Sequence, residues 1–102
     1  MENTKTMSTS EILRILSELK IEVRKRYKAD IRGIFGSYVR GEEEKGSDID
    51  VLVEFDDGAN LLDLTGLSLF LEKKLNCHVD VVPESAIRSE IKESILREVA
   101  YI

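Results

Sequence analysis

Residues 48–58, DIDVLVEFDDG, carry the clearest strand pattern in the sequence, and the rest of the fold can be built around them. Apolar and polar residues largely alternate over residues 49–55, and the apolar ones are mostly β-branched, which is the two-residue period of a strand with one buried face. The cluster at 56–58 then supplies a turn signal. The stretch therefore predicts a strand over 49–55, with Asp48 and Asp50 on one face at its start.

Helical patterns flank this strand on both sides. Before it, Ser8 and Glu11 have the spacing of a capping box, and the apolar residues that follow predict a helix over 9–28. After it, Asn60 can cap a helix whose apolar positions keep helical spacing as far as Asn76. A last helix is predicted just after Pro83, with a single apolar stripe formed by Ile87, Ile91, Ile95 and Val99.

Two further strands complete the predicted sheet. Residues 31–35 are short, mostly apolar and followed directly by Gly36, while residues 78–82 alternate and stop at Pro83. A short helical turn is expected near Ser37. The order α, β, short α, β, α, β, α predicts an α/β (α+β) fold, a small mixed sheet flanked by helices, in one domain over 1–102 whose residues 1–8 are frayed or disordered.

Composition narrows the classes of function. The 102 residues are 42% hydrophobic and 34% charged, as in a folded globular domain, and their net charge of −5 disfavours stable binding to nucleic acid. One cysteine and one histidine, Cys77 and His78, provide neither an internal disulfide nor a Cys/His zinc site. No apolar stretch reaches the roughly 20 residues of a membrane span. We expect a cytoplasmic protein without membrane attachment.

The acidic residues around the predicted strand suggest a metal site. Asp48 and Asp50 share a face of the strand, where two like charges are unfavourable unless a cation lies between them. If the third strand lies beside the second, Asp80 brings a third carboxylate to the same patch. Hard divalent ions prefer such oxygen ligands, and three carboxylates can hold two magnesium ions about 3.5–4 Å apart. The alternative for an Asp-x-Asp pair is ordinary solvated turn chemistry.

The pair Gly36-Ser37 predicts a phosphate cradle at the end of the first strand. Glycine allows close approach of backbone N–H groups to an anion, and a helical turn starting near Ser37 would aim its free N–H donors at the same spot. Neither a Walker A loop nor a Rossmann fingerprint has this spacing. A plain tight turn at Gly36 is the alternative.

Taken together, Gly36-Ser37, ten intervening residues and Asp48-Ile49-Asp50 resemble the signature of the DNA polymerase β-type nucleotidyltransferase superfamily. The longer string GSYVRGEEEKGSDIDVLVEF, with Val79-Asp80-Val81-Val82-Pro83, resembles the minimal nucleotidyltransferases that act as MNT-type antitoxins of HEPN/MNT modules. The resemblance implies that Asp48, Asp50 and Asp80 are the catalytic, magnesium-binding residues. It also implies that Gly36, Ser37 and Arg40 bind the nucleotide, although Arg40 could instead pair with the acidic residues 42–44.

This family resemblance implies a function. We expect a magnesium-dependent enzyme that transfers AMP from ATP to a tyrosine hydroxyl of a helical HEPN ribonuclease toxin, with which it forms a hetero-oligomer. A binding module that neutralises the toxin without catalysis is the alternative from another class. A small-molecule transferase of the aminoglycoside type is disfavoured because 102 residues leave little room for extra substrate-binding elements.

Overall fold

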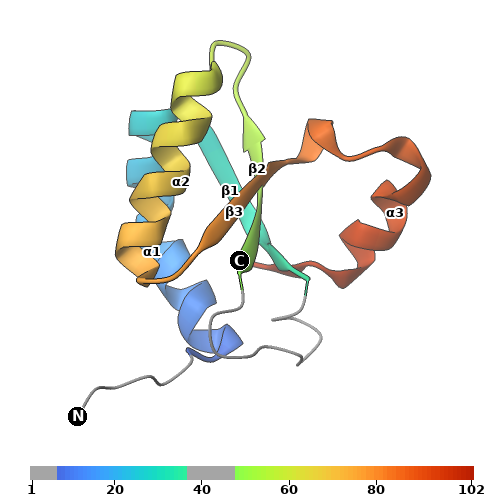
Figure 1. Cartoon of the computed structure of the whole chain (residues 1–102), viewed down its shortest axis with the longest axis horizontal. Helices are drawn as coiled ribbons and strands as arrows, with labels where there is room; N and C mark the ends of the chain where they lie inside the picture. Colours follow the sequence, from blue (N-terminus) through green and yellow to red (C-terminus); the bar gives the residue numbers. More distant parts are fainter. Residues whose placement is uncertain (1–6, 37–47) are drawn as a thin grey trace.

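A computed structural model of the chain describes residues 7–36 and 48–102. Within these residues three α-helices accompany one four-stranded sheet, which confirms the predicted mixed α/β class (Figure 1). None of the helices in these two ranges is both long and apolar enough to cross a membrane. The elements in chain order are α1 (Thr9–Tyr27), β1 (Ala29–Phe35), β2 (Ile49–Phe55), α2 (Leu61–Leu75), β3 (Val79–Pro83), a 3₁₀ helix η1 (Glu84–Ala86), α3 (Ser89–Glu98) and β4 (Ala100–Tyr101).

The sheet has the strand order β3-β2-β1-β4. β1 is antiparallel to both β2 and β4, whereas β2 and β3 are parallel. α1 and α2 lie side by side against one face of this sheet, and α3 lies on the other side of the strands (Figure 1). The strand with the clearest sequence pattern, β2, is therefore central and has neighbours on both edges.

The core lies between the sheet and the two helices α1 and α2. Alternate residues of β2 enter it, as the period-2 pattern predicts: Ile49, Val51 and Val53 are all fully buried. Leu16 of α1 and Leu71 of α2 are also completely buried against them. Burying such a side chain contributes about 1.5–3 kcal/mol, so this face is the main source of stability.

A β-bulge in β1 changes which residues enter the core. The register against β2 shifts between Ile31 and Gly33, which leaves Arg32 as the extra residue. Because of this shift, both Ile31 and Ile34 are fully buried although they are three residues apart. The bulge also sets Phe35 opposite Asp50, at the end of β1 nearest the acidic residues.

The predicted capping residues begin both long helices. The hydroxyl of Ser8 accepts the backbone N–H of Glu11 at 3.1 Å, and the carboxylate of Glu11 accepts the N–H of Ser8 at 2.9 Å. Asn60 and Asp63 form the same reciprocal pair at the start of α2. Met7 packs against the core, and Ser8 is the N-cap of α1; residues 1–6 lie outside the described residues.

The C-terminal region differs from the prediction. Instead of one helix starting just after Pro83, the chain forms η1 and then α3, with Ile87 and Val99 in extended conformations on either side of α3. The two residues of β4 then pair with Gly33 and Ile34 of β1. A strand of two residues is too short to show a period, which is why no sequence pattern predicts it.

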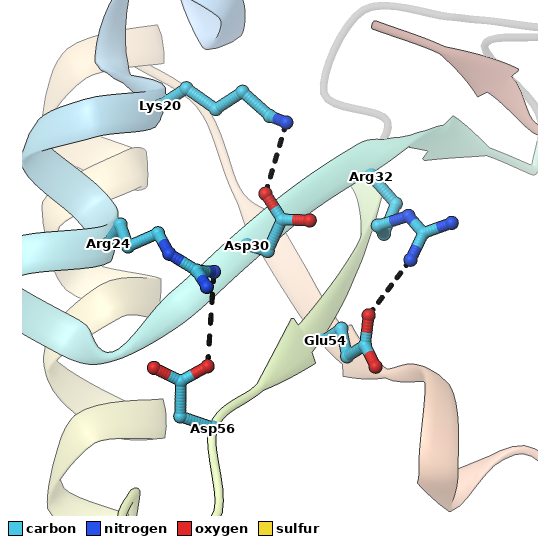
Figure 2. Close-up of polar contacts among 6 residues, drawn as sticks. All are labelled: Lys20, Arg24, Asp30, Arg32, Glu54 and Asp56. Carbon is cyan, nitrogen blue, oxygen red and sulfur yellow. Dashed lines mark hydrogen bonds and ion pairs between the residues drawn. The ribbon is translucent and has the colours of Figure 1, made fainter.

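At the end of β2 that is remote from Asp48, two ion pairs join α1 to the strand region and a third joins β1 to β2 (Figure 2). Each pair is at least partly exposed to water, so each stabilises the fold by no more than about 1 kcal/mol. The three pairs are Lys20–Asp30 at 3.0 Å, Arg24–Asp56 at 3.8 Å and Arg32–Glu54 at 2.9 Å.

Candidate active site

The strand register brings two of the predicted acidic residues together. β3 lies beside β2 in parallel, and Asp50 is the direct partner of Asp80. Neighbouring strands are about 4.8 Å apart, and partners in a parallel pair point to the same face. Asp48 precedes Asp50 by two residues, or roughly 6.7 Å along an extended chain. The condition that the sequence left open, that the third strand lies beside the second, is met.

These carboxylates lie on the face of the sheet opposite the main core. Ile49 and Val51, the residues between and after the first two aspartates, are fully buried on the helix side. Asp48 and Asp80 are exposed to solvent, whereas Asp50 is half-buried. Two of the three aspartates are therefore open to solvent on the face that does not carry the main core.

Gly36 sits directly against Asp50. It follows the last residue of β1, has a positive φ of +90°, and would place a Cβ atom in collision with Oδ2 of Asp50. Any larger residue would be strained in this backbone conformation and would displace the carboxylate. The predicted glycine is thus packed against the predicted acidic site. Its two proposed companions in nucleotide binding, Ser37 and Arg40, lie outside the described residues.

The donor set suits a hard divalent cation, because it consists of carboxylate oxygens only. Within residues 7–36 and 48–102, however, no three His, Cys, Asp or Glu side chains are already arranged as a group that could hold a metal ion. Like charges placed side by side are unfavourable unless a cation lies between them. The backbone register supplies the pairing of Asp50 with Asp80, and the side chains must complete it.

The start of β3 carries a further set of polar contacts. The N–H of Ile49 donates to the carbonyl of His78 at 3.0 Å, and Nδ1 of His78 lies 3.4 Å from a carboxylate oxygen of Glu72. Burial raises the pKa of the Cys77 thiol, and the negative charges of Glu72 and Asp48 raise it further. No sequence pattern points to Glu72. Its contacts with His78 and Cys77 depend on how α2 packs beside the start of β3, which no local pattern predicts.

Comparison with known proteins agrees with this geometry. The family described as nucleotidyltransferase domain matches residues 13–102. The protein adenylyltransferase MntA of Thermococcus cleftensis is 42% identical over 96 residues, which cover 94% of this chain and 97% of that protein. A candidate protein adenylyltransferase of Methanocaldococcus jannaschii is 37% identical over 94 residues, covering 91% of this chain and 96% of its own length.

Solved structures share the fold. A candidate minimal nucleotidyltransferase superposes with a TM-score of 0.79 at 37% identity, covering 96% of this chain and 99% of that chain. A toxin–antitoxin crystal structure with AMP-PNP has a TM-score of 0.66 at 22% identity, covering 93% of this chain and 72% of that chain, a likeness of fold alone. The chain therefore belongs to the nucleotidyltransferase-domain family and is an enzyme of the nucleotidyltransferase class.

Proposed function

We propose that this enzyme is an antitoxin that transfers AMP from magnesium-bound ATP to a tyrosine hydroxyl of a partner toxin of the helical HEPN class. The observation that carries the proposal is the direct pairing of Asp50 with Asp80 beside Gly36. The 42% identical relative is named a protein adenylyltransferase, and structures of related fold are toxin–antitoxin complexes.

In this proposal Asp48, Asp50 and Asp80 hold two Mg²⁺ ions. Magnesium held by these residues would supply charge neutralisation at the α-phosphate and the leaving pyrophosphate and would lower the pKa of the attacking hydroxyl. The tyrosine oxygen forms a bond to the α-phosphorus while the bond from that phosphorus to the bridging oxygen breaks. Pyrophosphate leaves, and the carboxylate of Asp80 accepts the hydroxyl proton.

Gly36 has two roles in this proposal. Its missing side chain leaves room for the carboxylate of Asp50, because a Cβ atom at this position would collide with Oδ2. Together with Ser37 and Arg40, it also contacts the triphosphate of ATP. Donors placed at the phosphates before the reaction begins stabilise charge without reorganisation, and holding the reactants in line contributes much of the remaining rate.

The resemblance supplies the class of partner, and the net charge of this chain bears only on the sign of the partner's charge. A net charge of −5 favours association with a basic protein over binding to nucleic acid, because complementary charge steers encounter. We therefore propose a hetero-oligomer of this chain with a basic toxin in the cytoplasm.

Labelled ATP tests the proposal. The protein is incubated with ATP labelled at the α-phosphate, Mg²⁺ and its partner, and the transferred label is measured for wild type and for the double variant Asp48→Asn/Asp50→Asn. We expect transfer by the wild type and a loss of at least roughly 100-fold in the double variant, consistent with removal of the groups that position the reaction. The matched control is Asp56→Asn/Asp57→Asn, which makes the same change at the other end of β2.

The same variants distinguish catalysis from simple binding. If the Asp48→Asn/Asp50→Asn protein transfers no AMP but still protects cells from the toxin, the antitoxin acts by covering its partner. If the wild type transfers no label to the partner, or the double variant transfers as much as the wild type, the catalytic proposal is wrong.

A further inference from the structure

The edge strand β3 is held by two side chains of α2. The backbone N–H of Val79 donates to a carboxylate oxygen of Glu72 at 3.2 Å. The hydroxyl of Ser68 donates to the backbone carbonyl of Val79 at 3.3 Å. Ser68 and Glu72 are four residues apart on α2, so they lie on one face of that helix. Both main-chain groups of a single strand residue are thereby bound by one helix.

These two bonds use groups that the sheet does not. The carbonyl of His78 points to β2, where it accepts the N–H of Ile49 at 3.0 Å. Main-chain groups alternate in direction along a strand, so those of Val79 point to the free edge of the sheet. Val79 is only 3% exposed, and buried main-chain groups require partners. Glu72 and Ser68 supply both.

The two contacts from Ser68 and Glu72 to Val79 form a clamp on β3. Its position matters because Val79 immediately precedes Asp80. β3 has five residues, lies at the edge of the sheet and ends in Pro83, which has no N–H to donate. A shift of one residue in its register would turn Asp80 to the opposite face of the sheet. A shift of two would set another residue beside Asp50. Few backbone bonds oppose such shifts, so contacts from outside the strand have a large share in fixing the register.

We propose that Ser68 and Glu72 are positioning residues of the transfer reaction, which hold β3 in the register that sets Asp80 beside Asp50. They touch neither nucleotide nor acceptor in this proposal and act only through the backbone of Val79. The inference rests on the proposed function for its effect on the reaction, while the effect on strand register stands on the contacts alone.

The expected effect is selective. Loss of the clamp displaces the carboxylate of Asp80 but leaves Gly36, which directly follows β1, in place. The rate constant kcat therefore falls about 10- to 100-fold, as when a residue that orients a metal ligand is removed. The KM for ATP changes less than about threefold, and the Mg²⁺ concentration for half-maximal rate rises about 10-fold or more.

The experiment compares variants that remove the contact with variants that keep it. Glu72→Ala and Ser68→Ala remove one bond each. Glu72→Gln keeps a carbonyl oxygen that can accept the N–H of Val79, and Ser68→Thr keeps a hydroxyl. Matched controls on the exposed side of the same helix are Thr65→Ala and Lys73→Ala.

Two measurements are made on each protein. Amide hydrogen exchange and cross-strand nuclear Overhauser effects report the protection of Val79 and the pairing of β2 with β3 without any need for activity. Steady-state kinetics report kcat, KM and the magnesium requirement. We expect Glu72→Ala to speed exchange at Val79 by about 10-fold or more and to lower kcat, and we expect Glu72→Gln to restore both. The controls should change neither measurement.

Either of two results would overturn the inference. One is unchanged protection of Val79 in both alanine variants, which would show that the strand does not depend on the clamp. The other is lost protection with unchanged kcat and magnesium requirement, which would show that the clamp does not position Asp80. A wild type that transfers no AMP would instead refute the proposed function, and the exchange data would still decide whether the clamp sets the register.

Discussion

Replacing Gly36 with alanine adds one methyl group where Asp50 leaves no room for it. The backbone at this position has φ of +90°, the single positive-φ glycine among the described residues. A Cβ atom built there collides with Oδ2 of Asp50 and lies 3.3 Å from its Cγ. The substitution therefore strains the backbone and pushes on the carboxylate at the same time.

Both effects have a predictable size. Left-handed backbone conformations cost a residue with a side chain about 1–2 kcal/mol. For a domain near 100 residues, each kcal/mol lowers Tm by about 4–8 °C, so we expect Gly36→Ala to melt about 4–16 °C below wild type. Displacement of Asp50 by about 1 Å should reduce AMP transfer roughly 100-fold, because positioning errors of that size carry such costs.

Gly58→Ala is the matched control. Gly58 is exposed in the turn after β2, and a Cβ atom there meets nothing within 4 Å. Its free energy of unfolding should stay within about 0.5 kcal/mol of wild type, as is typical of surface changes, so its Tm should be nearly unchanged. Its transfer rate should also match that of the wild type. Melting is followed by circular dichroism, and transfer by labelled ATP. The reasoning about Gly36 is refuted if Gly36→Ala keeps wild-type transfer, or if Gly58→Ala loses as much.

Three further outcomes follow from the described contacts. The raised pKa of Cys77 keeps its thiol protonated, so iodoacetamide near pH 8.5 should alkylate the folded protein more slowly than the urea-unfolded chain. The stability that this group contributes is lost as pH rises through the raised pKa. Equal alkylation rates for the folded and unfolded protein would contradict burial of the thiol. Gly33→Ala would drive a Cβ into the carbonyl of Ala100, so we expect a loss of about 1–3 kcal/mol in urea unfolding, and an unchanged midpoint would refute this close packing of β4. Arg32→Gln, which breaks the exposed pair with Glu54, should cost less than about 1 kcal/mol, and a larger loss would mean that this pair is energetically more than a surface contact.

The parts of the fold that can be predicted from sequence are those with a local physical signal. Period-2 alternation identifies β2, and Asn60 marks the start of α2, because strand burial and helix capping depend on neighbouring residues. The pairing of Asp50 with Asp80 requires more than two predicted strands, because these strands must also be adjacent, parallel and in the observed register.

The remaining features depend on contacts between distant segments. β4 has two residues and forms only because β1 offers Gly33 and Ile34 as partners, so no local pattern announces it. The contact of Glu72 with Val79 likewise depends on how α2 docks on the sheet edge. Spacing predicts that the three carboxylates converge, but side-chain direction depends on charge balance at the site as well as on backbone register.

Paramagnetic broadening by Mn²⁺ tests the metal assignment most directly. Substoichiometric Mn²⁺ is added to ¹⁵N-labelled protein, and the backbone amide signals are followed in the wild type and in Asp50→Asn. We predict that the signals of Asp48, Asp50 and Asp80 broaden first in the wild type, that those of Asp56 and Asp57 at the far end of β2 persist, and that Asp50→Asn removes the selectivity. Broadening that begins at Asp56 and Asp57, or that is uniform over the chain, would contradict a shared cation site at the three aspartates.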